Sequence, residues 1–311
     1  MTLTELKYII AVAKERHFGK AADSCFVSQP TLSIAIKKLE DELGVVIFER
    51  GPEISVTDIG KKIIEQAHKI MSEVNDLKAL AKQGQNPLVG SLKLAAIYTI
   101  APYLLPYLIP IEQKMTPEMP LVLSEGYTAD LLVALKSGEL DCAILALPIE
   151  DKSLEIIPLY DEAFVAALPA HHPLAHQDVI CMDELKNETL LMLGPGHCFR
   201  DQVLEYCPEN NHYSKLAQDA SHTLEGSSLE TIRHMVATGL GYTILPLSAT
   251  YKNKSKLLSY ISLKPNKEGF LPKRTVALVC RQSFIRKEAV YALAKAIKKV
   301  EIEGLNFFPT T

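Results

Sequence analysis

With 311 residues, of which 48% are hydrophobic and 23% charged, the chain is long enough for two or three globular domains with buried cores. It has no signal-like N-terminus and no apolar run of membrane-spanning length, so we expect a cytoplasmic protein without a membrane partner, whose six cysteines are normally reduced. The net charge of −4 excludes a generally basic nucleic-acid binder, so any DNA contact must come from a local arrangement of charges.

Apolar residues at helical spacing predict three short helices in the first 45 residues. The second is expected over Lys20–Cys25, and the third is capped by Ser28 and ended by Gly44, with Pro30 tolerated in its first turn. The first helix is expected to bury Leu3, Leu6, Ile10 and Ala13, and the third Leu32, Ile36, Leu39 and Leu43.

The opposite face of the third helix carries amides, hydroxyls and lysines, which can contact base edges and phosphates. Two helices joined by a tight turn, followed by wing strands over Val45–Phe48 and Ile54–Val56, predict a winged helix-turn-helix over residues 1–58. A helical cluster with a solvated polar face is the alternative, since acidic residues outnumber basic ones over residues 1–60. The predicted DNA contacts are Ser28, Gln29, Pro30, Thr31, Ser33, Lys37, Lys38 and Arg50.

A long helix is expected to begin at Thr57 or Asp58 and to lead into a polar hinge over Gln83–Gly90. Its apolar residues follow heptad spacing, which is typical of a helix that pairs with a second copy. We therefore assign residues 59–90 to a linker and dimerisation helix with its hinge, the alternative being that this seam packs on its own domain. The heptad positions are Ile59, Ile63, Ala67, Ile70, Val74 and Leu77.

Strands alternate with helices over residues 91–311, which predicts an α/β domain with largely parallel sheets and two lobes around a cleft. Thr99 and Thr128 each follow a strand, so their hydroxyls either line that cleft or cap loops. Helices are expected over Leu131–Ser137, Ser228–Thr238 and Lys287–Glu303. The expected strands are Leu92–Ile97, Leu121–Glu125, Asp141–Ala146, Phe164–Leu168, Thr189–Leu193, Tyr242–Pro246 and Thr275–Cys280.

The stretch from Gly194 to Pro208 combines a glycine-rich loop with a short helix over Phe199–Tyr206. Cys198 is expected at or near the helix N-terminus, beside His197 and Arg200. A helix N-terminus and neighbouring cations favour the thiolate, which is the nucleophilic form of cysteine.

Cys207 follows the far end of the same helix, about 13 Å from Cys198 along the axis at a rise of roughly 1.5 Å per residue. A disulfide needs Cα atoms within about 7 Å, so a bond between them would require the segment to refold. Two alternatives stay open: buried cysteines that only fill the core, and a zinc site whose spacing matches no usual pattern. That zinc site would use His197, Cys198, Cys207 and His212.

The remaining cysteines lack a comparable setting. Cys25, Cys142 and Cys280 lie among apolar residues of predicted helices or strands, so we interpret them as structural, and Cys181 is undecided.

The run from Phe18, FGKAADSCFVSQPTLSIAIKKLEDELG, resembles the DNA-binding signature of LysR-type transcriptional regulators. The order of helix-turn-helix, linker helix and two-lobed effector domain is also that family's order and covers essentially the whole chain. Within the family, the run GHCFRDQVLEYC resembles the redox segment of its hydrogen-peroxide sensors. The resemblance implies an α/β, periplasmic-binding-protein-like effector domain over residues 91–311, and a regulator rather than an enzyme.

The same resemblance implies a role for each matching residue. Cys198 corresponds to the peroxide-reacting cysteine and Cys207 to its resolving partner in a reversible disulfide that changes the grip on promoter DNA. Thr99, Thr128 and His197 match the peroxide pocket, and Arg200 and Asp201 the polar network beside it. The implied assembly is a homodimer that forms a homotetramer and acts with RNA polymerase, with no metal and no cofactor.

One departure concerns the wing, where residues 51–55 carry no basic side chain, unlike many related sensors. Fewer cations predict weaker phosphate contact and a shallower salt dependence. Two other functions remain open: a regulator of the same family that binds a small organic effector, with Cys198 a bystander, and a thiol peroxidase, against which the helix-turn-helix argues.

Overall fold

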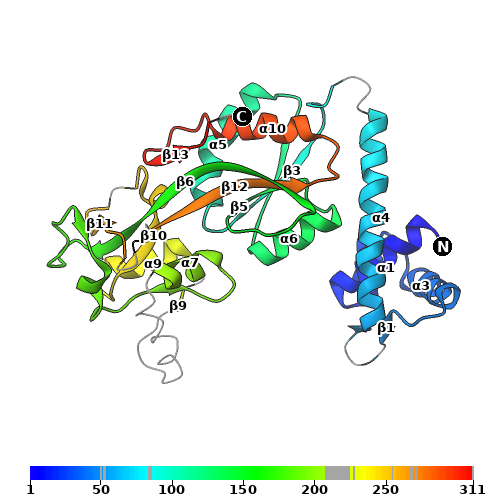
Figure 1. The fold of residues 1–311 in the computed structure, drawn as a ribbon. Helices are drawn as coiled ribbons and strands as arrows, with labels where there is room; N and C mark the ends of the chain where they lie inside the picture. Colours follow the sequence, from blue (N-terminus) through cyan, green and yellow to red (C-terminus); the bar gives the residue numbers. More distant parts are fainter. Residues whose placement is uncertain are drawn as a thin grey trace. The chain divides into compact units, whose positions relative to one another are not determined.

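The computed structural model describes residues 1–49, 51, 54–82, 86–206, 225–226, 228–253, 255–266, 269 and 272–309. The chain divides into two compact units, residues 1–86 with 133–140 and residues 87–132 with 141–311. Figure 1 shows the helical unit and the sheet-containing unit. No helix of the described residues is both long and apolar enough to cross a membrane.

The first unit contains the predicted helix-turn-helix and long helix. Ser28 caps the third helix with its side chain, and Gly44 ends that helix at φ +67°, as the sequence predicts. Its wing strands pair antiparallel, with Phe48 opposite Val56. The elements are α1 (Leu3–Glu15), α2 (Phe18–Ser24), α3 (Gln29–Leu43), β1 (Phe48–Glu49), β2 (Ser55–Val56) and α4 (Asp58–Lys82).

Some of the predicted burial in this unit is wrong. The buried stripe of α1 includes Leu6, Ile9 and Val12, while Leu3 is 43% exposed. Leu43 at the end of α3 is also exposed. Both residues belong to the outermost turns of their helices, where few neighbouring side chains are available to cover them. α2 begins at Phe18, earlier than expected, because the His17 imidazole accepts the amide hydrogens of Gly19 and Lys20.

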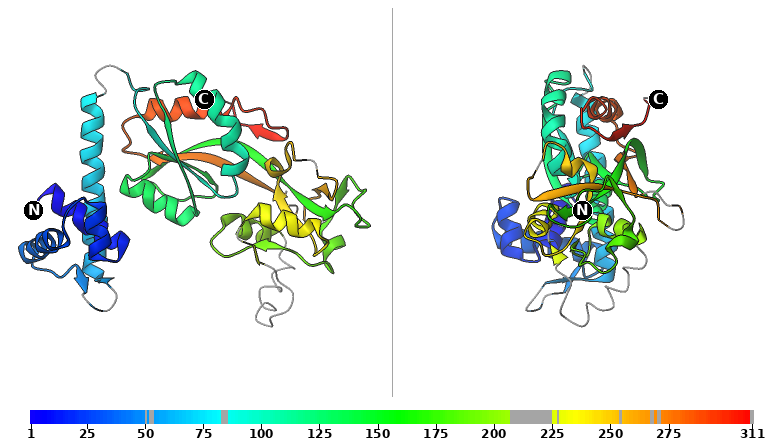
Figure 2. Two further views of the ribbon diagram at one scale, coloured as in Figure 1. Left: turned by 180° about the vertical axis from the view of Figure 1, so that it is seen from behind. Right: turned by 90° about the vertical axis from the view of Figure 1, so that its left-hand side faces the viewer.

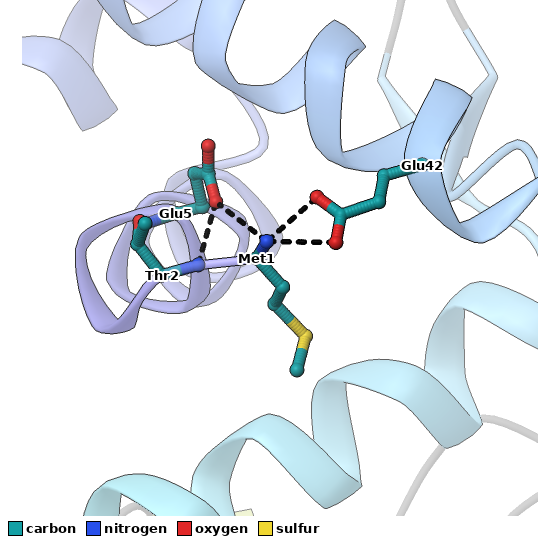
Figure 3. A network of polar contacts seen from close by, with 4 residues as sticks. All are labelled: Met1, Thr2, Glu5 and Glu42. Atoms are coloured by element: carbon teal, nitrogen blue, oxygen red, sulfur yellow. Dashed lines mark hydrogen bonds and ion pairs between the residues drawn. The ribbon is translucent and has the colours of Figure 1, made fainter.

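Local polar contacts fix the start of α1. The Thr2 hydroxyl accepts the Glu5 amide at 3.2 Å and the Glu5 carboxylate accepts the Thr2 amide at 2.7 Å, which is a reciprocal capping box. Figure 3 shows the amino group of Met1 between the carboxylates of Glu5 and Glu42. The contact from Met1 to Glu42 ties the beginning of α1 to the end of α3.

The second unit is built on a nine-stranded sheet in which β4, β3, β5, β12, β6, β11 and β7 follow in that order, with β10 and β13 also pairing with β6. Its strands are β3 (Leu92–Ile97), β4 (Leu121–Gly126), β5 (Cys142–Ala146), β6 (Leu154–Pro169), β7 (Val179–Ile180), β10 (Thr243–Pro246), β11 (Leu258–Leu263), β12 (Lys273–Arg281) and β13 (Leu305–Phe307). A small parallel sheet joins β8 (Met192–Leu193) and β9 (Glu225–Gly226).

The expectation of largely parallel sheets is wrong. β12 runs antiparallel to both β5 and β6, and β10, β11 and β13 run antiparallel to β6. The cause is β6, a 16-residue strand whose first part pairs with β12 and whose second part pairs with β10 and β11. β6 thereby joins the strands beside β12 to the strands β10 and β11, and β12 returns beside it (Figure 1).

The chain between and after these strands also forms helices. They are α5 (Ala101–Met115), α6 (Thr128–Ser137), α7 (Cys198–Tyr206), α9 (Leu229–Ala237) and α10 (Lys287–Ile297), with 3-10 turns at Met182–Leu185 and Leu247–Thr250. α10 ends at Ile297 rather than at the predicted Glu303, and it packs against α5, as Figure 2 shows from behind. One large apolar core of the second unit gathers residues of β6, α7, α9, β10 and β11.

Candidate functional site

The exposed face of α3 presents most of the predicted DNA contacts. Gln29, Thr31, Lys37 and Lys38 are exposed and Ser33 is partly buried. The Ser28 hydroxyl accepts the Thr31 amide at 3.3 Å and bonds the Thr31 hydroxyl at 2.8 Å, so both hydroxyls already serve the cap. Ser28 and Pro30 are exposed as well, whereas Arg50 lies outside the described residues, as do Pro52 and Glu53 of the wing.

Sequence reasoning missed an apolar residue on this face. Ile34 is 69% exposed and lies three positions from both Thr31 and Lys37, so it belongs to the same helix face as these polar residues. Helical spacing places Ile34 on the side of α3 opposite the buried Leu32 and Ile36, so the sequence pattern could have predicted its exposure. Phe26, in the turn before α3, is 95% exposed with a left-handed φ of 57°.

The predicted helix after the glycine-rich loop is present and begins at Cys198 itself. Its buried side is formed by Phe199, Val203 and Tyr206, at the spacing read from the sequence. The Cys198 thiol is partly buried in the first turn. Gly196 has a φ of +94°, a conformation that side chains rarely adopt, and this turn delivers the chain into the helix.

A small cavity lies in front of Cys198. The space open to the centre of a water-sized molecule is about 10 Å³, enough for roughly one water. Three of the sequence-predicted pocket residues line it together with the cysteine, so residues far apart in the sequence meet here. The lining residues are Ile97, Thr99, Gly126, Tyr127, Thr128, Gly196, His197 and Cys198.

The hydroxyls of the two threonines that line the cavity differ in their hydrogen bonding. The Thr128 hydroxyl, at the first residue of α6, is buried and has no hydrogen-bond partner among the described residues. The Thr99 hydroxyl accepts from Arg274 Nη1 at 2.9 Å, and the Thr99 carbonyl accepts from Arg274 Nη2 at 2.9 Å. A buried hydroxyl left without a partner costs about 1–3 kcal/mol, which a small polar molecule in the cavity would offset.

Arg274 is a residue of this region that sequence reasoning missed. It pairs with Glu162, both side chains being fully buried, with 2.8 Å between Arg274 Nε and Glu162 Oε2. Glu162 also accepts the Ser248 amide at 2.8 Å, and the Arg274 guanidinium lies over the Phe199 ring of α7 at 5.2 Å from its centroid. This buried pair therefore connects the loop of Thr99 to the first turn of α7.

His197 is 5% exposed and packs edge-on between two tyrosines, with ring centroids 6.0 Å from Tyr98 and 4.8 Å from Tyr127. Arg200 Nη1 donates to the Leu193 carbonyl at 2.8 Å, which ties α7 to β8. Asp201 is exposed, and neither it nor Arg200 is among the residues that line the cavity.

The hypotheses about the thiols include two residues that the structure does not describe. Cys207, the predicted resolving cysteine, and His212 of the zinc alternative both lie outside the described residues. Among the described residues, no group of three or more His, Cys, Asp and Glu side chains is arranged to hold a metal ion.

Comparison with known families matches nearly the whole chain. Residues 3–61 match the bacterial regulatory helix-turn-helix protein of the lysR family, and residues 85–301 match the LysR substrate binding domain. The DNA-binding transcriptional dual regulator OxyR of Escherichia coli is 40% identical over 301 residues, covering 96% of this chain and 95% of that protein. The hydrogen peroxide-inducible genes activator of Haemophilus influenzae is 37% identical, covering 98% of this chain and all of its own length.

Solved structures agree with this similarity. A full-length cysteine-to-aspartate variant of OxyR from Pseudomonas aeruginosa is 44% identical and covers 98% of both chains, with a TM-score of 0.78. A hydrogen-peroxide-bound cysteine-to-serine variant of OxyR from Corynebacterium glutamicum is 31% identical and covers 96% of this chain and 92% of its own, with a TM-score of 0.63.

Proposed function

The chain belongs to the LysR family of bacterial transcriptional regulators, and we propose that it is activated by hydrogen peroxide through oxidation of Cys198. The chain is a homologue of OxyR, with the similarity covering 96% of its length. It is a hydrogen-peroxide-inducible gene activator and not an enzyme. Its place of action is the cytoplasm, where promoter DNA and RNA polymerase are found.

One observation carries the assignment of Cys198. A thiol at a helix N-terminus borders a water-sized cavity, and the same cavity holds the buried Thr128 hydroxyl without a partner. The unpaired hydroxyl can bind a small molecule that carries hydrogen-bonding oxygens. Hydrogen peroxide has this chemistry and is close to water in size.

In the reaction, the Cys198 thiolate attacks one peroxide oxygen. The O–O bond breaks, sulfur takes one oxygen as sulfenic acid, and the other oxygen leaves as hydroxide and takes a proton to become water. His197, or a water held by the two threonine hydroxyls, supplies that proton. Arg274 is a positioning residue, because its two hydrogen bonds fix the Thr99 side chain and backbone.

The second step is condensation of the sulfenic acid with the Cys207 thiol, which releases water and forms a disulfide. The helix from Cys198 to Tyr206 holds its ends roughly 12 Å apart at 1.5 Å per residue. One further residue spans only 3.8 Å between Cα atoms, whereas a disulfide needs Cα atoms within about 7 Å. Forming the bond therefore requires α7 to lose its helical form, and this refolding is the signal.

The DNA-binding unit receives the signal. The face of α3 that carries Gln29 and Lys37 enters the major groove, where Ile34 contacts a thymine methyl group. Along α4, Ala67 is buried in its own unit, whereas Ile59 is 46% and Leu77 is 66% exposed. These exposed heptad positions support a homodimer through α4, and two dimers form the tetramer.

The test replaces one atom. Full-length Cys198→Ser is expected to bind promoter DNA as tightly as the wild type and to lose transcriptional induction by hydrogen peroxide in a reporter strain. Cys181→Ser, which changes a half-buried cysteine away from the cavity, is the matched control and keeps full induction. Retained induction in Cys198→Ser contradicts the proposal.

A further inference from the structure

Two cysteines of the sheet face each other although they are far apart in the sequence. β5 and β12 pair antiparallel, and the register places Cys280 directly opposite Cys142. Side chains of directly opposed residues in an antiparallel pair lie on the same face of the sheet. Both cysteines are 0% exposed.

The hydrogen bonds of the ladder show which type of pair this is. The Leu147 amide donates to the Thr275 carbonyl at 2.9 Å, and Leu147 is the residue opposite Thr275. Hydrogen-bonded and non-hydrogen-bonded pairs alternate along an antiparallel ladder. Five steps further along, Cys142 and Cys280 therefore form a non-hydrogen-bonded pair, the type with Cα atoms about 4.5 Å apart and the closer side chains.

This spacing falls within the range that a disulfide accepts, which begins at about 4.4 Å between Cα atoms. We propose that Cys142 and Cys280 are a second thiol pair of this protein, which closes to a disulfide when the oxidant is in excess. Unlike a bond between the two ends of a helix, this bond forms between residues that are already neighbours. The proposal does not depend on the reaction at Cys198.

The surroundings of the pair explain why its oxidation is slow and which of the two sulfurs reacts first. Burial raises the pKa of both thiols, so little thiolate is present at neutral pH. The Lys287 ammonium lies 3.9 Å from the Cys280 sulfur and opposes this rise, whereas the Cys142 sulfur faces the Lys93 carbonyl at 4.0 Å. Cys280 is therefore the sulfur that attacks first.

Access comes from the end of the ladder. Cys142 is the first residue of β5, and its pair with Cys280 is the last of the register between these strands. Strand ends open more readily than strand centres, so a small oxidant reaches the pair there without unfolding of the whole unit.

The reaction balances with hydrogen peroxide as the oxidant. The Cys280 thiolate breaks the O–O bond and becomes a sulfenic acid, and the released hydroxide takes a proton to form water. The Cys142 sulfur then attacks the Cys280 sulfur, its proton leaves with the oxygen as a second water, and the S–S bond forms. Two thiols and one peroxide thus give one disulfide and two waters.

The experiment uses the full-length Cys198→Ser protein, which lacks the fast thiol. It is incubated with excess hydrogen peroxide, alkylated under denaturing conditions and mapped as non-reduced peptides. We expect a crosslinked peptide joining residues 142 and 280 that dithiothreitol removes and that forms at least about tenfold more slowly than oxidation of Cys198 in the wild type.

Cys280→Ala in the same background is the matched control. It removes one buried sulfur, keeps the fold by circular dichroism and yields no crosslink from Cys142. Diamide, which oxidises thiols without a sulfenic acid, gives the same crosslink in the parent. Recovery of Cys142 as an alkylated thiol after both oxidants, or its crosslinking to any cysteine other than Cys280, overturns the proposal.

Discussion

The second unit places cysteine in two opposite settings. Cys198 is partly exposed at the first turn of α7, in front of a cavity with an unpaired hydroxyl, whereas Cys142 and Cys280 are fully buried opposite each other in the sheet. At α7 the thiol is accessible but its proposed partner is at the far end of a helix. In the sheet the partner is adjacent, but burial slows the access of the oxidant. The backbone around each cysteine thus decides how fast the thiol is oxidised and how far the structure must change to form the disulfide.

The largest expected effect comes from breaking the buried ion pair of Arg274 and Glu162, which lies next to the Cys198 region. Arg274→Met leaves the Glu162 carboxylate buried without its partner, which lowers the free energy of unfolding by about 3–5 kcal/mol. It also releases Thr99 and slows oxidation of Cys198. Urea unfolding and thiol-oxidation kinetics measure the two effects.

Lys273→Met is the neighbouring control, because its pair with Asp161 is partly exposed and contributes at most about 1 kcal/mol. Equal losses of stability in the two variants would show that burial of the Arg274 pair has no special role.

Alkaline pH probes the sheet thiols. Burial raises the pKa of both thiols in the folded state above that of a solvated cysteine, so above about pH 9 the unfolded chain releases protons that the folded state keeps. The contribution of the two thiols to the free energy of unfolding is therefore fully present below that pH. It declines as the pH rises, by up to about 1.4 kcal/mol per pH unit for each thiol. The charged groups around the two thiols are Asp141, Glu155, Arg281, Arg286 and Lys287.

Urea unfolding between pH 8 and pH 10.5 checks this decline. Cys142→Ala should show a shallower slope than the wild type, since one of the two titrating sulfurs is absent. Parallel slopes in the two proteins would mean that Cys142 does not keep its proton in the folded state.

Thr128→Val tests whether the unpaired hydroxyl serves the reaction. Replacing a buried hydroxyl that has no partner by a methyl group should raise the free energy of unfolding by about 1 kcal/mol. Loss of its hydrogen bond to peroxide should slow Cys198 oxidation about tenfold, as followed by stopped-flow mixing. Thr238→Val, at an exposed threonine whose hydroxyl donates to the Met235 carbonyl, is the control and leaves the oxidation rate unchanged. An unchanged oxidation rate in Thr128→Val would remove the hydroxyl from the mechanism.

Ile34→Ala leaves both thiol regions intact and alters only DNA reading. The probe is a duplex selected in vitro by the full-length protein, made with either thymine or uracil, which lacks the methyl group. The wild type should bind the uracil duplex about fivefold more weakly, the variant should bind both duplexes alike, and peroxide should oxidise both proteins at the same rate. Lys37→Ala, a phosphate-contact control, weakens both duplexes equally. A variant that still prefers thymine contradicts the role of Ile34.

Local patterns predicted α7 and α3 well because their signals lie within a few residues. The glycine-rich loop, the spacing of Phe199, Val203 and Tyr206, and the cap at Ser28 each act over a single helix. Ile34 was within reach of the same method, since helical spacing already places it on the polar face of α3.

The remaining features depend on which strands pair. The sequence marks a short apolar strand at Phe164–Leu168 but does not show that β6 runs from Leu154 to Pro169 and pairs with several strands. Arg274 and Glu162 are 112 positions apart and meet only because β12 returns antiparallel to β6. The pairing of Cys142 with Cys280 follows from the same reversal, which no periodicity reveals.

Time-resolved, non-reduced peptide mapping of the wild-type full-length protein tests the order of the two thiol regions most directly. After about one equivalent of hydrogen peroxide, we expect the bond between Cys198 and Cys207 alone. With excess peroxide, the bond between Cys142 and Cys280 follows. An unmodified Cys198 at the time when another cysteine has reacted would contradict the account.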